Sequence, residues 1–249
     1  LILYKFSSET GVGRIRRQET KNISWYRVLG GYKKAVHRIH NSRGTKFAIV
    51  ISILVEITAM IGTTFWQIIA SRRIGVPDTL LPVFPMAKSI MSIVLFFTVI
   101  SRIDQKKLKW PLYGGFASAI AGCLLLISVK NTGAWGYFIL SVSLFFEALG
   151  MAVLSTLRES LAAIYADPEE RSVVLAILQT IVMLVSIPFG YIGGLLSDIS
   201  KMLPFVLCIV LLLLGILATA VFFRSRQEEP FPGNISVTED VTAEYTRSR

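Results

Sequence analysis

The sequence predicts an all-α membrane protein with six transmembrane helices. Six long apolar blocks lie between residues 47 and 223, and each is close to the roughly 20 residues that a helix needs to cross a bilayer. The mean hydropathy of +0.61 and the charged content of 17% fit this class, because soluble proteins average about 25% charged residues. Lipid offers the backbone no hydrogen-bond partners, so each block must form a helix. The expected spans are residues 47–70, 79–101, 111–129, 135–157, 173–197 and 203–223.

The segment 1–46 is expected to be a cytoplasmic linker that contains a basic amphipathic helix. Between Ser24 and His40, apolar residues recur at helical spacing, and lysine, arginine and histidine occupy the other faces. Such a helix suits the anionic cytoplasmic leaflet of a membrane. An ordinary connector packed on protein is an equally open interpretation. The apolar positions are Trp25, Val28, Leu29, Tyr32, Val36 and Ile39.

The first two spans carry polar side chains at membrane depth. In the first span, Glu56 lies near the middle, and the spacing of Glu56, Thr63 and Gln67 places all three on one helical face. The second span contains Lys88. Ionisable residues within a membrane are costly and are functional candidates by default.

The fourth span carries Glu147 near its middle and Arg158 toward its cytoplasmic end, and the fifth span carries Gln179. A glutamate is too short to reach the interface from mid-span, so we favour a functional role for Glu56 and Glu147. The alternative for both is a buried hydrogen bond from a protonated carboxyl group. For Arg158 we favour snorkelling or a structural ion pair.

Small residues predict close helix packing in the third and fifth spans. Gly114, Ser118 and Gly122 recur at every fourth position of the third span, as do Gly190 and Gly194 in the fifth. This spacing allows the backbones of two helices to approach closely. The sixth span contains four consecutive leucines and no such feature, so it is expected to face lipid.

The basic residues predict the orientation of the chain. Most of the 26 lysines and arginines lie in the linker, the loop before the third span, the region 158–171 and the tail 224–249, all on one side of a six-span topology. By the positive-inside rule both termini are then cytoplasmic, in a protein of the plasma membrane. The polar tail is expected to be disordered. The basic residues expected on the opposite side are Arg72, Arg73, Lys130 and Lys201.

Neither an enzyme, a cofactor nor a metal site is expected. The zincin, serine-hydrolase and P-loop motifs are missing from the sequence. His37 and His40 lie in the linker, and Cys123 and Cys208 lie in separate spans, where we interpret them as inert thiols. The net charge of +10 is attributed to membrane orientation, so no nucleic-acid partner is expected.

Three loops and their order resemble the major facilitator superfamily of transporters. The loop 101–107, with Asp104 and basic neighbours, resembles the second copy of that family's Asp-plus-basic loop motif, although it lacks the glycines. Residues 166–171 (ADPEER) resemble the loop between the tenth and eleventh helices, and residues 188–198 resemble the Gly-rich end of the eleventh. Over about residues 20–223, the chain resembles the C-terminal six-helix half of such a transporter.

The resemblance implies alternating-access transport of a small solute, with a proton or sodium ion possible as the coupled ion. It also implies a 3+3 inverted repeat, and the mid-span glutamates in the first helix of each triplet agree with it. The substrate- or proton-binding candidates are Glu56, Thr63, Gln67, Glu147 and Gln179. The cytoplasmic gate candidates are Asp104, Lys106, Arg158 and Arg171.

The family has twelve helices, so we expect a chain that begins at Leu1 to be a fragment that lacks the first six-helix bundle. One alternative is a complete six-helix protein that dimerises into a transporter or channel. A membrane-embedded enzyme is a less favoured alternative. The substrate is not identified, because the span aromatics suit a sugar, a drug or a peptide equally. These aromatic residues are Phe65, Trp66, Phe145 and Phe146.

Overall fold

The structure is a computed structural model that describes residues 42–98, 108–129, 133–165 and 171–225. Within these residues all regular structure is helical, as the sequence predicts. The first helix continues without a break into one π-helical turn, η1. The elements are α4 (Arg43–Ile69), η1 (Ala70–Ile74), α5 (Val83–Thr98), α6 (Lys109–Ser128), α7 (Ala134–Tyr165), α8 (Arg171–Ile199) and α9 (Leu203–Ser225).

Five of these helices are long and apolar enough to cross a membrane, which supports the predicted multi-pass membrane class. They are α4 with its π-helical extension, α6, α7, α8 and α9. The second predicted span, 79–101, coincides with the shorter helix α5, which has 16 described residues. Residues 79–82 form a turn before it, since Pro82 lacks the N–H group that a helix interior requires.

The start and end of α4 have identifiable causes. Ser42 caps the helix by accepting a hydrogen bond from the backbone N–H of Thr45 at 3.3 Å. This places the start of α4 four residues before the predicted span. After η1, Gly75 adopts the left-handed conformation (φ 77°) that commonly ends a helix.

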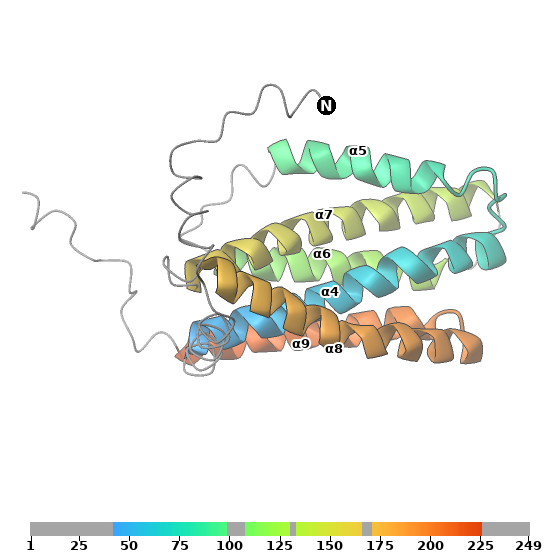
Figure 1. Cartoon of the computed structure of the whole chain (residues 1–249). Coiled ribbons are helices and arrows are strands. Elements are labelled where there is room, and N and C mark those ends of the chain that lie inside the picture. Colours follow the sequence, from blue (N-terminus) through green and yellow to red (C-terminus); the bar gives the residue numbers. More distant parts are fainter. Residues whose placement is uncertain (1–41, 99–107, 130–132, 166–170, 226–249) are drawn as a thin grey trace, which may run out of the picture.

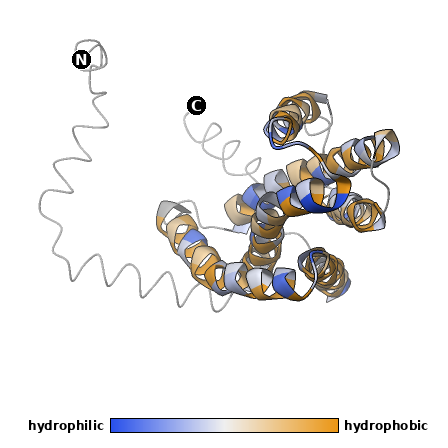
Figure 2. Cartoon of the chain, turned by 90° about the vertical axis from the view of Figure 1, so that its right-hand side faces the viewer, coloured by the Kyte–Doolittle hydropathy of each residue, from blue (hydrophilic) through white to orange (hydrophobic). Residues whose placement is uncertain are grey.

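Four helices form a closed ring, and the other two lie outside it. The ring runs α4–α7–α6–α9 and back to α4, each helix packing against the next. Helix α5 packs mainly against α7, and α8 packs mainly against α4 (Figure 1). Figure 2, a view along the helices, shows α5 and α8 at separate edges of the bundle, and these two helices make no backbone contact with each other.

Helices α6 and α7 approach each other most closely, because small residues line their contact. A Cβ atom added to Gly122 would lie 2.8 Å from the backbone nitrogen of Glu147, and one added to Gly150 would meet the backbone of α6. Ser118 donates a hydrogen bond to the carbonyl oxygen of Phe146 at 2.7 Å, and Ser143 donates one to that of Gly122 at 2.8 Å. Backbone and side chains therefore interlock along this pair.

The predicted small-residue pattern is right for some positions and wrong for others. Gly122 and Ser118 lie in the contact, but the space around Gly114 is open, and Gly115 packs instead against Val153 and Leu154. In α8, Gly193 packs against Phe65, whereas the space around Gly194 is open. A spacing of four residues identifies a stripe along a helix but leaves open which stripe faces the neighbour.

Helix α9 faces protein on one side, which corrects the prediction that it faces lipid. Leu211 and Leu212 are buried against the bundle, and Leu213 and Leu214 are exposed. The four leucines are alike in sequence, so only the contacts of α9 with α4 and α6 distinguish them.

Candidate functional site

Two ion pairs connect α7 to its neighbours within the bundle. Glu147 of α7 lies 2.9 Å from the ammonium nitrogen of Lys88 of α5. Arg158 of α7 lies 2.5 Å from the carboxylate of Glu56 of α4. The Glu147 side chain is 11% exposed, against 32% for Glu56, so the Lys88–Glu147 pair includes the more deeply buried acid.

Each glutamate that the sequence identifies at mid-span thus has a cationic partner. A buried charge without a partner is strongly unfavourable, and pairing offsets that cost. The structure agrees with the ion-pair interpretation of Arg158, and it gives Lys88 a partner that the sequence analysis did not assign. The sequence did contain a signal for these pairs, because its apolar helices carry the two acids Glu56 and Glu147 and the two bases Lys88 and Arg158.

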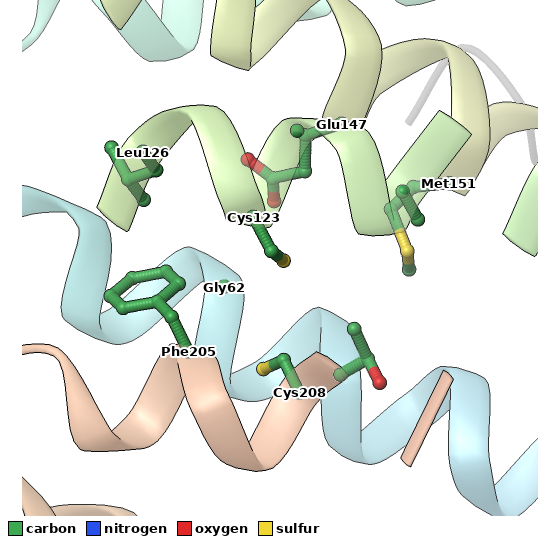
Figure 3. Close-up of a pocket in the computed structure, with 10 residues that line it drawn as sticks. Gly62, Cys123, Leu126, Glu147, Met151, Phe205 and Cys208 are labelled. Carbon is green, nitrogen blue, oxygen red and sulfur yellow. The ribbon is translucent and has the colours of Figure 1, made fainter. Parts of the chain in front are cut away.

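A small cavity lies beside the carboxylate of Glu147 (Figure 3). Its volume is about 10 Å³, which is on the order of the space for a single water molecule. Cys123 of α6 and Cys208 of α9 line it together with Gly62 of α4. A Cβ atom at Gly62 would lie 2.7 Å from the nearer carboxylate oxygen, so the glycine leaves room for the acid.

The two cysteines illustrate what the sequence could not show. They lie in separate spans, and the sequence predicts two inert thiols. In the structure both are buried, both are free, and both line the cavity beside Glu147. Four helices therefore line this cavity, namely α4, α6, α7 and α9, and Lys88 of α5 contacts the same acid.

A larger groove of about 390 Å³ runs between α5 and α7. Typical small-molecule sites have volumes of about 300–1,000 Å³, and the volume of this groove falls within that range. Phe96 and Met151 form part of an apolar lining. The polar residues that line the groove are Lys88, Ser92, Ser155, Thr156 and Glu159.

The other binding candidates lie apart from the groove lining. Thr63 is exposed on α4 and donates its hydroxyl hydrogen bond to the carbonyl oxygen of Ala59 at 2.9 Å. Gln67 is exposed near the end of α4, and Gln179 is half-buried on α8. None of Glu56, Thr63 and Gln67 lines either the small cavity or the groove.

Two of the gate candidates, Asp104 and Lys106, lie outside the described residues. Arg171 is the first residue of α8, and its side chain is also outside the described part of the chain. Among the gate candidates only Arg158 is placed with its side chain, in the ion pair with Glu56.

The four span aromatics do not gather in one place. Phe65 and Trp66 are buried in the core, and the Trp66 ring lies 5.9 Å from that of Phe84. Phe145 is exposed and Phe146 is half-buried on α7. None of these four side chains lines the groove between α5 and α7.

Within the described residues, no group of three or more histidine, cysteine, aspartate or glutamate side chains is arranged to hold a metal ion. The sequence matches no protein-family model, and no curated protein is significantly similar to it.

Proposed function

We propose that this chain is a six-helix bundle of a secondary active transporter of the major facilitator type, which moves a small solute across the plasma membrane by alternating access. The observation that carries the proposal is the groove between α5 and α7, which is lined by Lys88, the partner of Glu147 in an ion pair. A solute-sized space next to a titratable charge is the arrangement that coupled transport requires.

The helix contacts support a repeat of three plus three helices. In such a repeat, α4, α5 and α6 of the first triplet correspond to α7, α8 and α9 of the second. The contact of α5 with α7 then corresponds to the contact of α8 with α4. In the same way, the contact of α6 with α7 corresponds to the contact of α9 with α4. On this proposal α5 also crosses the membrane, and both termini are cytoplasmic.

The ion pairs provide the coupling. Each pair joins α7 to a different helix, so a change of charge at either pair alters how firmly α7 is held. Removing one partner of a buried pair leaves the other charge uncompensated, which is strongly unfavourable. A proton that neutralises Glu147 therefore changes the relative stability of the conformations that face the two sides of the membrane.

A second six-helix bundle completes the proposed transporter. In this arrangement α4 and α7, flanked by α5 and α8, form one wall of a central path. The other wall belongs either to a further part of the same protein or to a second copy of this chain. Transport by alternating access then results from rocking of the two walls about the shared site.

The test is proton-coupled flux in proteoliposomes that contain the full-length protein and enclose a pH-sensitive dye. A panel of sugars, amino acids, organic acids and lipophilic drugs is added in turn under an imposed pH gradient. We expect at least one solute to accelerate proton entry in the parent protein. Glu147→Gln, which keeps the shape of the side chain but cannot titrate, should abolish this acceleration.

Asp78→Asn is the matched control, since Asp78 is an exposed acid outside the helices and should leave the flux unchanged. The same panel is repeated with radiolabelled solutes under a sodium gradient, and uptake of the solute itself is counted, which separates proton coupling from sodium coupling. If no solute produces flux under either gradient, the transporter proposal is wrong.

A further inference from the structure

Lys88 connects the buried acid Glu147 to the groove between α5 and α7. Its ammonium group donates a hydrogen bond to the carboxylate of Glu147 at 2.9 Å, and Glu147 in turn lines the small cavity. The same side chain lines the groove of about 390 Å³ between α5 and α7. The side chain of Lys88 therefore lies between the acid and the groove.

The groove suits an organic anion that brings hydrogen-bond donors. Lys88 is the basic side chain of its lining, and Ser155 and Thr156 already donate their hydroxyl hydrogens to the carbonyl oxygen of Ala152. Their oxygen atoms remain as acceptors toward the groove. Phe96 and Met151 provide contact for an apolar part of the ligand.

The groups that surround Glu147 leave Lys88 as its charge partner. From α6 and α9 the thiols of Cys123 and Cys208 face the same cavity, and α4 presents Gly62 and Thr58, neither of which titrates. The other ion pair lies eleven residues further along α7, about 16 Å away at 1.5 Å per residue. Glu159, the acidic residue of the groove lining, is exposed and lies twelve residues after Glu147 on α7, about 18 Å away at 1.5 Å per residue. A proton on Glu147 would thus leave Lys88 without its ion-pair partner.

We propose that Lys88 is a shared cation, held by Glu147 when that acid is ionised and released, when Glu147 takes up a proton, to bind a carboxylate or phosphate group in the groove between α5 and α7. This inference rests on the proposed function and gives the substrate class as a small organic anion. Bulk water supplies the proton that neutralises Glu147. The substrate anion then takes the place of the Glu147 carboxylate as the negative partner of Lys88. Proton and anion then bind cooperatively, and by linkage each raises the affinity for the other by the same factor.

The experiment measures binding in the absence of any gradient. The full-length protein in phosphatidylcholine nanodiscs is titrated with benzoate, glutarate and glucose 6-phosphate at about pH 5 and about pH 8. A carboxyl group with the usual pKa of about 4.3 is protonated in a far larger fraction at the lower pH. The neutral counterparts are benzamide, glutaramide and glucose. A ligand that binds the folded protein raises its melting temperature, which is followed by intrinsic fluorescence.

We expect at least one anion to bind about tenfold more tightly at the acidic pH, within the usual range of coupling factors. Its neutral counterpart should have no effect. Glu147→Gln should bind that anion equally well at both pH values, and Lys88→Gln should lose binding at both. Lys109→Gln, at an exposed position of α6 outside the groove, should behave like the parent.

If a single substitution prevents folding, the double variant Lys88→Gln with Glu147→Gln retains no unpaired charge and should fold without binding the anions. Anion binding by this double variant would overturn the proposal. The proposal would also be overturned if Glu147→Gln folds but none of the three anions raises its melting temperature. A lipid phosphate has the same chemistry as the probes. Stabilisation by added phosphatidylglycerol alone, without any effect of the solutes, would assign the groove to lipid and overturn the substrate class.

The result separates this inference from the proposed function. Proton-coupled flux without pH-dependent anion binding would leave the transporter proposal intact and refute the role of Lys88. Anion binding with the expected variant pattern, in a protein that transports none of the panel, would support the site and contradict transport.

Discussion

The four charged residues inside the bundle differ in how far they are exposed. Glu147 contacts Lys88, a glycine and a small cavity, and its side chain is 11% exposed. The side chain of Glu56 is 32% exposed although it is paired with Arg158. A partly exposed pair is screened more strongly than a buried one, so the two pairs should differ in their energetic contribution.

A double-mutant cycle on Glu56 and Arg158 measures the energetic contribution of the more exposed pair. We expect Arg158→Gln alone to lower the free energy of unfolding by about 1–3 kcal/mol. This is less than the about 3–5 kcal/mol lost when a fully buried pair is broken, because the Glu56 carboxylate is partly exposed. Adding Glu56→Gln should restore most of the loss, since no charge is then unpaired. The measurement is reversible unfolding in mixed micelles, and additive effects would show that the two residues are not coupled.

At the scale of helices, the contact of α6 with α7 is the closest in the bundle. Gly122 and Gly150 leave no room for a side chain, and Ser118 and Ser143 add hydrogen bonds between the two helices. This contact fixes the rotation of α7. The same rotation directs Glu147 toward Lys88 and places Glu159 in the lining of the groove.

Substitution of single glycines tests the packing of these helices. A Cβ atom at Gly150 would lie 2.5 Å from the backbone nitrogen of Ala119, which cannot move without shifting α6. We expect Gly150→Ala to destabilise the protein by about 1–3 kcal/mol. Gly114→Ala, on the open side of α6, should change stability by no more than about 0.5 kcal/mol. Equal melting temperatures of the two variants would contradict the contact.

At the scale of the whole molecule, the ring of four helices leaves α5 and α8 with fewer partners. Only Leu95 of α5 is buried among its described residues, and many of its large apolar side chains are exposed. Exposed apolar surface of this extent suits contact with lipid or with a second bundle. The position of α5 relative to the membrane therefore bears directly on the proposed six-span arrangement.

Reporter fusions determine whether α5 crosses the membrane. A reporter that is active only outside the cytoplasm is fused after Arg43, Arg73, Lys107, Lys130, Arg171 and Lys201 in separate variants. We expect activity after Arg73, Lys130 and Lys201 only, because the positive-inside rule keeps the other three positions in the cytoplasm. Equal activity after Arg73 and Lys107 would mean that α5 does not cross.

The sequence by itself determined that the chain is helical and of the multi-pass membrane class, and which charges lie within its apolar helices. These are local properties, because in lipid each segment must satisfy its own backbone hydrogen bonds. Only the tertiary structure decided that Lys88 pairs with Glu147, that Gly115 packs while Gly114 does not, and that Cys123 and Cys208 share one cavity. Such pairings depend on the rotation of each helix and on its neighbours. Helical periodicity shows which residues share a face, but it does not show which helix that face meets.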